Sequence, residues 1–465
     1  MSLNHDIINR SEGQETSEGT YPTSAPPPDS KGAVAPAVID LLSTTTLMVF
    51  EGILLGRYSS AALAGGGMGL QFLFLMFTIF LTFVMGASVP ISRLIGAGKK
   101  READRLFGNA MGSILAISLV FSVFSLMTAG VFFEYIFGAT GEVRAAGVGY
   151  FRFIALFMPL IALNFSGTGI LRATGDAFSA MIANLTANII SIFLAILLVF
   201  GFEPLGIAPM GAKGSALALG IGQTVGFVVM LRFMMTGKTA ISLRLKDIIG
   251  QKWQTMKRII KTGLPVTAEQ FFWMSGQVII IAYLGRLGEA PLAAHQIIVR
   301  LTQTLGVVYQ GLAFGNMALC GRHIGADNEA RAVIVSRRIR YISLGVSFVL
   351  AGVVYFNAPA IVRLFTFDPE VTRLALIIIP ILALQQIPKS QTMITTSELR
   401  ARGDLVFIAL VGGSFVALDM LGLAYLGVFV FGWGLPVIWA LHVFDEIGRL
   451  TVHLFRMRRR IVKAV

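Results

Sequence analysis

LRATGD at residues 171–176 returns as LRARGD at residues 399–404, displaced by 228 positions (399 − 171 = 228). Two further pairs are displaced by 229 positions: Gly56-Arg57 matches Gly285-Arg286, and IGA at 95–97 matches IGA at 324–326. Matches that keep one order and one spacing indicate a duplicated unit. The sequence therefore predicts two halves with the same fold.

The composition indicates a membrane protein. Hydrophobic residues make up 55% of the chain and charged residues 14%, and the mean hydropathy is +0.76. A soluble chain carries about 25% charged residues. Apolar runs of about 20 residues, the length that a helix needs to cross the hydrocarbon core, recur along the chain. Runs such as residues 114–133 do not alternate between apolar and polar residues, which excludes the short alternating strands of a β-barrel.

We predict an all-α membrane protein with 12 transmembrane helices, six in each half. The predicted spans are residues 33–56, 63–94, 106–137, 147–171, 178–201, 212–235, 257–284, 291–322, 333–366, 371–399, 404–430 and 434–455. The predicted domains are a disordered cytoplasmic tail (1–32), an N-terminal six-helix bundle (33–235), a cytoplasmic linker (236–256), a C-terminal six-helix bundle (257–455) and a basic cytoplasmic tail (456–465).

Basic residues fall in alternate loops. The loops after even-numbered spans and the C-terminal segment are the richer in them: Lys99, Lys100, Arg101, Arg172, Lys238, Arg244, Arg322, Arg331, Arg456 and Arg458. Cytoplasmic loops carry the excess of Lys and Arg, so we expect both termini in the cytoplasm and the chain in the plasma (inner) membrane. The net charge of +13 follows this pattern and does not indicate nucleic-acid binding.

Six spans per half is an even number, so both halves enter the membrane with the same polarity. Such parallel repeats are related by an axis along the membrane normal. We expect two bundles around a central cleft, in which a transporter would bind a small-molecule substrate, and we expect a monomer in the lipid bilayer.

The sequence predicts neither an enzyme nor a cofactor. Cys320 is the single cysteine, which rules out a disulfide within the chain and a cysteine-based metal site. No ATPase motif is present, so the energy for transport must come from an ion gradient. The glycine-containing stretches IGAGKK (95–100) and LRATGD are interpreted as helix ends, with Gly96, Gly98 and Gly175 terminating helices and Arg172 on the inner surface.

Several motifs in a fixed order resemble the multidrug and toxic compound extrusion (MATE) family of cation-coupled efflux transporters over residues 33–455. They are Pro36 with an acid fifteen residues on, Gly56-Arg57, AALA at 61–64, IGAGKKREA at 95–103, ILRATGD at 170–176, PLGIAPMGAKGSALA at 204–218, GLP at 263–265 and LAAHQI at 292–297. The resemblance implies an antiporter that exchanges inward H⁺ or Na⁺ for an outward-moving, drug-like and usually cationic substrate by alternating access.

Glu51 is the leading candidate for ion coupling and for contact with a cationic substrate. It lies five residues before Gly56, about 7.5 Å from the outer end of the first span. A carboxylate at that depth costs a few kcal/mol unless it is protonated, paired or hydrated. The alternative is an interfacial acid paired with Arg57. The resemblance implies an ion-coupled acid, usually Asp, at the corresponding position.

The family's other polar positions are only partly present. Asn164 stands where a fourth-span Asn is expected, whereas Ser191 and Ala195 occupy fifth-span positions that often hold Asn and Asp. Asn184 and Asn188 lie nearby and complete the set of candidate ion-coupling residues in this half. The missing second carboxylate favours H⁺, with Na⁺ at Glu51 as the weaker possibility.

In the second half, Asp419 is a candidate ion-coupling residue and Lys389 a candidate substrate ligand. They lie at similar distances from the turn at Arg402 (402 − 389 = 13 and 419 − 402 = 17), so they could meet. Asp419 is also the repeat equivalent of Ser191 (419 − 191 = 228). Two interpretations remain: a fixed ion pair between Lys389 and Asp419, or a second proton site in the C-terminal bundle.

Four residues of the seventh span are candidate substrate ligands: Glu269, Gln270, Trp273 and Gln277. A hydrated acid in the inner mouth is an equally good interpretation of Glu269. His295 is interpreted as a packing or capping residue, and Asp445 and Glu446 are expected to pair with Arg449 or nearby bases.

Two alternatives to drug export stay open within the same superfamily. A lipid-linked precursor flippase would need a strongly cationic cavity, whereas here Lys389 is the one base placed inside. Export of an organic anion or siderophore would also use Lys389. A non-transporting membrane receptor would give Glu51 and Asp419 no role.

Overall fold

The structure is a computed structural model that describes residues 30–136, 140–202, 204, 206–236, 239–249 and 253–464. The predicted tail lies outside the described residues up to residue 29, as do positions 237–238 and 250–252 of the predicted linker. Within the described residues the chain is helical, apart from turns and one isolated bridge between Phe202 and Ile207.

Six long helices form the N bundle. They are α2 (Ser30–Tyr58), α3 (Ser60–Gly96), α4 (Lys100–Val131), α5 (Gly141–Thr174), α6 (Ala177–Phe200) and α7 (Ala212–Met235). A π-helical turn (Phe132–Ile136) extends α4, and the short helix α8 (Leu245–Ile249) lies in the connection to the second half.

The C bundle repeats this order. Its helices are α9 (Trp253–Leu287), α10 (Glu289–Gly325), α11 (Glu329–Phe356), the short α12 (Ala358–Arg363), α13 (Pro369–Ala401), α14 (Leu405–Val416) and α15 (Gly434–Ala464). Two π-helical segments, Ala417–Leu423 and Leu426–Val430, continue α14.

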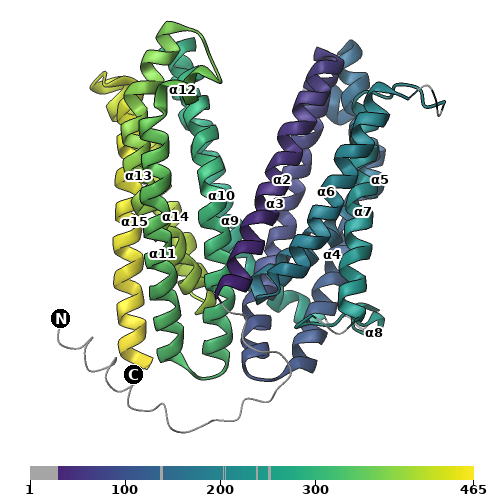
Figure 1. The fold of residues 1–465 in the computed structure, drawn as a ribbon, viewed down its shortest axis with the longest axis vertical. Helices are drawn as coiled ribbons and strands as arrows, with labels where there is room; N and C mark the ends of the chain where they lie inside the picture. The colour runs from purple at the N-terminus through teal and green to yellow at the C-terminus, as the bar shows by residue number, and fades with distance from the viewer. Residues whose placement is uncertain are drawn as a thin grey trace.

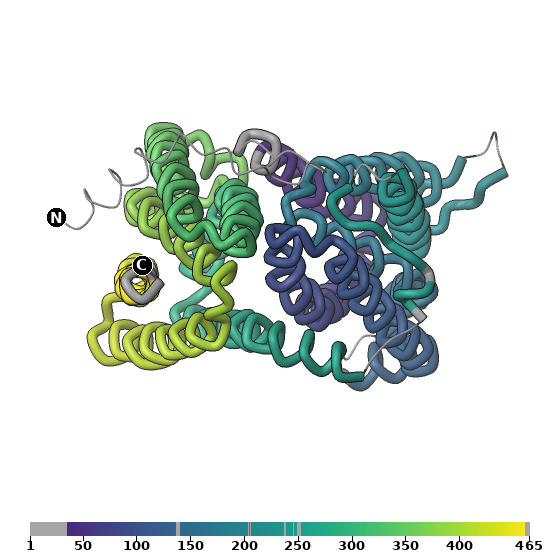
Figure 2. Tube along the Cα trace, turned by 90° about the horizontal axis from the view of Figure 1, so that it is seen from below, coloured from purple at the N-terminus to yellow at the C-terminus, as the bar shows by residue number. Residues whose placement is uncertain are grey.

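The predicted fold class is confirmed: the chain is an all-α membrane protein with two six-helix bundles. Figure 1 shows the bundles touching at one end and leaning apart toward the other, and Figure 2, seen from below, shows the green and yellow helices of the C bundle beside the purple and blue helices of the N bundle. Among the described residues, ten helices are long and apolar enough to cross a membrane. The remaining two predicted spans, α9 and α15, have 35 and 31 residues and are not among these ten.

The repeated LRxxGD motif is the end of one helix and the start of the next. Gly175 and Gly403 follow α5 and α13 with φ of 96° and 78°, in the left-handed region where a side chain would be strained. Asp176 then caps α6, since its side chain accepts a hydrogen bond from the backbone N–H of Ser179 at 3.2 Å. The interpretation of Gly175 as a helix end is confirmed.

Two predicted boundaries were wrong. The span predicted at 333–366 is divided at Asn357 into α11 and α12, because Pro359 in the first turn of α12 has no N–H with which to continue α11. The last helix does not stop at residue 455. It continues to Ala464, and Arg456 and Arg460 on this extension bind Asp404.

The end at which the bundles touch is called the basic end, because Lys99, Lys100, Arg322, Arg402 and Arg456 belong to it. There α3 packs on α9 without intervening side chains. A Cβ on Gly86 would lie 2.1 Å from the Ile259 carbonyl oxygen, and one on Gly263 would lie 1.8 Å from that of Thr82. The opposite end, where the bundles diverge in Figure 1, is called the open end.

Candidate functional site

Glu51 is buried in the N bundle between α2, α5 and α7, with 7% of its surface exposed. Its Oε1 atom accepts hydrogen bonds from Ser215 Oγ at 2.6 Å and from Tyr150 Oη at 3.0 Å. The pairing with Arg57 considered from the sequence is not observed. The carboxyl group is therefore held by two neutral hydroxyls.

A cavity of about 10 Å³ adjoins Glu51, and Ser191 lines it together with Ser215. That volume is about the least that a water molecule needs. Ser191 Oγ is buried and has no hydrogen-bond partner of its own. Ser191 and Glu51, two of the predicted ion-coupling residues, therefore line the same cavity.

A second polar cluster lies farther along α2 and contains the predicted residues Asn164 and Asn184. Asn164 Nδ2 donates to Asn184 Oδ1 at 3.1 Å and to Gln223 Oε1 at 2.7 Å. Asn184 Nδ2 donates to Asp40 Oδ1 at 2.9 Å. Asp40 lies 11 residues before Glu51, about 16 Å along the helix. The asparagines therefore belong to Asp40 and do not contact Glu51.

Asn188 lies between the two clusters. Its Nδ2 donates to Ser43 Oγ at 2.9 Å and reaches Thr44 Oγ1 at 3.5 Å. Asn188 forms no hydrogen bond with Glu51 or Asp40. The residues predicted as one ion-coupling set therefore contact α2 at three separate places along its length.

The partner of Asp40 is Arg172 of the LRATGD motif, whose Nη1 lies 2.7 Å from Asp40 Oδ2. Arg172 is 7% exposed and Asp40 is fully buried. The sequence interpretation placed Arg172 on the cytoplasmic surface, and this was wrong. Its guanidinium group points into the N bundle, because the Asp40 carboxylate of α2 lies there.

The C bundle contains the equivalent ion pair. Arg400 Nη2 lies 2.8 Å from Glu269 Oε2. The displacements match the internal repeat, since Glu269 follows Asp40 by 229 residues (269 − 40) and Arg400 follows Arg172 by 228 (400 − 172). Glu269 is thus not the isolated hydrated acid considered from the sequence, because the arginine of the second motif neutralises it.

The other candidates on α9 lie nearer the open end than Glu269. Trp273 is 38% exposed, while Gln270 and Gln277 are partly buried. Spacings of three, four and seven residues place them on one side of the helix.

Asp419 lies in the π-helical segment Ala417–Leu423 and is 1% exposed. Neither of its carboxyl oxygens has a hydrogen-bond partner. No ion pair joins it to Lys389, so the fixed pair considered from the sequence was wrong. The Nζ atom of Lys389 instead faces α10, 3.9 Å from the position that a Cβ on Gly306 would take. Asp419 lies in a π-helical segment, whose wider turns displace side chains from their α-helical positions.

Asp445 and Glu446 pair with Arg449, as predicted. Arg449 Nη2 contacts Asp445 Oδ2 and lies 3.2 Å from Glu446 Oε1. All three belong to α15. His295, on α10, is buried against Trp439, with ring centroids 5.6 Å apart, in agreement with a packing role.

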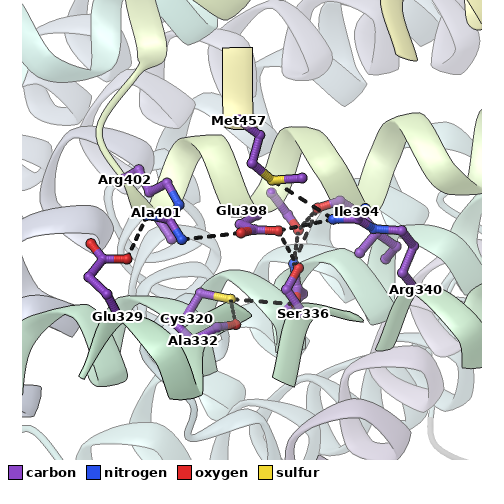
Figure 3. Close-up of polar contacts among 12 residues, drawn as sticks. Cys320, Glu329, Ala332, Ser336, Arg340, Ile394, Glu398, Ala401, Arg402 and Met457 are labelled. Carbon is purple, nitrogen blue, oxygen red and sulfur yellow. Dashed lines mark hydrogen bonds and ion pairs between the residues drawn. The ribbon is translucent and has the colours of Figure 1, made fainter. Parts of the chain in front are cut away.

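Glu398 organises a cluster at the basic end of the C bundle (Figure 3). Its Oε2 accepts from Ser336 Oγ at 2.5 Å and from Arg340 Nη2 at 3.2 Å, and its Oε1 accepts from Arg402 Nη2 at 3.3 Å. Arg402 also pairs with Glu329 at 2.6 Å. Each charge has an opposite partner, so the cluster fixes α11 against α13.

Two arginines join the bundles at the basic end. Arg93 on α3 donates to the Ala401 carbonyl oxygen from Nε at 3.0 Å and from Nη2 at 2.7 Å. Arg322 on α10 donates from Nε to the Thr174 carbonyl oxygen at 2.9 Å. Arg93 and Arg322 are repeat equivalents (322 − 93 = 229). This pair of contacts is called the arginine clasp.

The sequence model of one family, MatE, matches the chain twice, over residues 36–197 and 265–426. Both bounds move by 229 positions (265 − 36 and 426 − 197), which is the displacement of the internal repeat. The chain belongs to the MATE family. It is therefore a multi-pass membrane transporter and not an enzyme.

Relatives of this MATE transporter match it over most of its length. The uncharacterized transporter YisQ of Bacillus subtilis is 24% identical over 415 residues, 88% of this chain and 89% of the relative. The probable multidrug resistance protein NorM of Thermotoga maritima is 24% identical over 400 residues, 86% of this chain and 85% of the relative. A solved multidrug resistance MATE transporter in an outward-facing conformation, 21% identical, has a TM-score of 0.84 over 94% of this chain and 96% of that chain.

Sequence reasoning missed four residues that the transporter's structure brings to the candidate site: Asp40, Tyr150, Ser215 and Gln223. Asp40 was detectable as a second acid in the first apolar span, four residues after Pro36. Tyr150 and Ser215 carry no such signal, because a single hydroxyl in a transmembrane helix is common.

Proposed function

We propose that this MATE transporter is a secondary antiporter that exports drug-like organic compounds, mainly cationic ones, in exchange for H⁺ moving inward. Relatives named for multidrug resistance and multidrug export support the export of such compounds. The observation that carries the exchange is the environment of Glu51, a buried carboxyl group whose partners are the neutral hydroxyls of Ser215 and Tyr150.

An ionised carboxylate inside the membrane costs a few kcal/mol when no cation accompanies it. Either a bound proton or a nearby organic cation removes that cost. A protonated carboxyl group carries no charge with which to attract an organic cation. Proton binding and cation binding therefore exclude each other at Glu51. Competition of this kind converts a proton gradient into export when the site alternates between the two sides of the membrane.

The surroundings of Glu51 favour H⁺ over Na⁺. A dehydrated Na⁺ needs several oxygen ligands, whereas Glu51 has two hydroxyl neighbours and an adjoining cavity of about 10 Å³. The nearest additional carboxylate on α2, Asp40, is already paired with Arg172.

The arginine clasp supports alternating access. It holds the bundles together at the basic end, which the charge distribution assigns to the cytoplasm. The structure would then represent the state that is open to the outside, with both termini cytoplasmic. We further propose a monomer in the plasma membrane.

Transport into proteoliposomes under imposed gradients tests the proposal. A panel of cationic fluorescent dyes is loaded, and an H⁺ gradient or a Na⁺ gradient is applied in the absence of the other. We expect dye movement against its gradient with H⁺ alone. Movement with Na⁺ alone would contradict proton coupling and assign the site to Na⁺.

One observation favours a second substrate class. Lys389 forms no ion pair in the described part of the chain, and Glu446 pairs with Arg449 instead. An organic anion, such as a siderophore, or a lipid-linked pyrophosphate could bind there. The same assay with an anionic dye, comparing wild type with Lys389→Gln, separates this alternative from cation export.

A further inference from the structure

A cavity of about 740 Å³ lies in the N bundle between α4, α5 and α7. Glu51 does not line it, although the lining residues Gly149 and Lys213 lie close in sequence to Tyr150 and Ser215, the hydrogen-bond partners of Glu51. In Figure 1, α5 and α7 lie on the side of the N bundle turned away from the C bundle. Its volume is within the range of about 300 to 1,000 Å³ that small-molecule sites occupy. We call it the lateral groove. The MATE scaffold described above gives it no role.

Three basic residues line the lateral groove: Arg144, Arg152 and Lys213. Only Arg144 has an acidic partner, Glu134, at 2.6 Å, and its buried Nε has no hydrogen-bond partner. Arg152 and Lys213 are exposed and form no ion pair among the described residues. The groove therefore carries uncompensated positive charge.

Two of these bases, Lys213 and Arg152, lie on adjoining helices, one and five residues inside the predicted spans 212–235 and 147–171. The stem of Lys213 lies on Gly149, because a Cβ at residue 149 would come within 2.5 Å of Lys213 Cε. Arg152 is about one turn farther along α5 than Gly149 and lies five residues inside the predicted span 147–171, about 7.5 Å from its end. A cation at such a depth is costly unless it reaches an anion or the membrane surface.

The rest of the lining is apolar. Leu126, Phe153 and Leu156 face the same groove, and Leu156 is 59% exposed. The internal repeat does not retain Arg152, since the equivalent position in the C bundle (152 + 228) is Pro380.

We propose that the lateral groove binds an anionic phospholipid from the leaflet at the open end. Its phosphate would accept hydrogen bonds from the Arg152 guanidinium and the Lys213 ammonium, which are the donors that phosphate prefers in proteins. Its acyl chains would lie along Leu126, Phe153 and Leu156. A free phosphate ion satisfies the charges but leaves the apolar lining uncovered.

Lipid titration of the intact transporter tests the proposal. Native mass spectrometry is used to measure the affinity for phosphatidylglycerol and for phosphatidylcholine with the same acyl chains. We expect the wild type to bind phosphatidylglycerol at least fivefold more tightly. Arg152→Gln combined with Lys213→Gln should remove this preference and leave phosphatidylcholine binding unchanged.

Arg373→Gln is the matched control, because Arg373, near the start of α13 in the C bundle, is an exposed base that forms no ion pair among the described residues. A preference that persists in the groove double variant would overturn the proposal, as would an equal loss in Arg373→Gln. Full displacement of the lipid by millimolar inorganic phosphate would assign the groove to free anions. Should the double variant misfold, Lys213→Gln alone must lower the phosphatidylglycerol affinity at least threefold.

Discussion

Arg93 and Arg322, which are equivalent in the two halves of the chain, each donate hydrogen bonds to a carbonyl oxygen at the end of a helix in the opposite bundle. Glycines make this approach possible. A Cβ on Gly96 would lie 1.9 Å from the Arg322 carbonyl oxygen, and one on Gly325 would lie 2.1 Å from that of Arg93. The basic end is therefore closed by two near-symmetrical contacts that can open together.

Removing one arginine of the clasp should favour the state that is open at the basic end. A hydrogen bond from a charged group contributes about 1.5–3 kcal/mol, so Arg322→Gln should shift the equilibrium by about tenfold or more. Spin labels at Lys100→Cys and Arg331→Cys, in a Cys320→Ser background, would report a longer interbundle distance. Arg338→Gln is the control. An unchanged distance distribution in Arg322→Gln would mean that the clasp does not hold the closed end.

The two repeat-related ion pairs should differ in their contribution to stability. The Asp40 side chain is fully buried, whereas that of Glu269 is 21% exposed. Removing one partner of a buried pair costs about 3–5 kcal/mol, and solvent screening makes the contribution of a partly exposed pair smaller. Asp40→Asn should therefore destabilise the protein more than Glu269→Gln in SDS titrations. The reverse order would show that burial does not determine their strength.

Asp419→Asn should raise the melting temperature, because the carboxyl group is buried and neither oxygen has a hydrogen-bond partner. An unpaired buried charge is unfavourable, and the neutral amide has almost the same shape. Differential scanning fluorimetry in detergent at pH 8 measures this. If Asp419 is also a second proton site, its variant will change the pH dependence of transport, and an unchanged profile would reject that role.

Asp404 at the basic end makes a pH-dependent contribution to the stability of the fold. It immediately precedes the apolar span Leu405–Val430. Burial raises the pKa of this carboxyl group, but hydrogen bonds from Arg460 and Arg456 outweigh it and bring the pKa below the ordinary value of 3.8. The interaction therefore stabilises the fold above about pH 4, and the stabilisation is lost as the pH falls through the folded-state pKa. Asp404→Asn should lower the melting temperature at pH 7 and much less at pH 3. An equal loss of melting temperature at pH 7 and at pH 3 would exclude an ionic contribution of Asp404 to stability.

The repeat of LRATGD as LRARGD was sufficient to predict two equivalent bundles, because a helix end, a left-handed glycine and a capping acid recur together. Hydropathy gave the spans within a few residues for most helices. Hydropathy missed the helix break at Asn357, because the break depends on one proline. It also missed the extension of α15, because the extension depends on contacts of Arg456 and Arg460 with the distant Asp404.

The candidate site was predicted only in part. Glu51 and Ser191 could be proposed from their depth and repeat position, and the structure places them together. The grouping of Asn164 and Asn184 with Asp40 could not be predicted from the sequence, because it depends on the rotation of α2, α5 and α6 about their axes. The π-helical segment at Asp419 likewise shifts the face of its helix, which no count of residues from Arg402 could reveal.

Dye transport by Glu51→Gln in proteoliposomes tests the central claim most directly. The variant keeps the size of the side chain and its ability to accept from Ser215 but cannot exchange a proton. Glu102→Gln, which removes an exposed acid beside Lys99, is the control. We predict that Glu51→Gln loses H⁺-driven accumulation by at least tenfold, while Glu51→Asp retains part of it and Glu102→Gln all of it. Accumulation by Glu51→Gln at the wild-type rate would contradict the account.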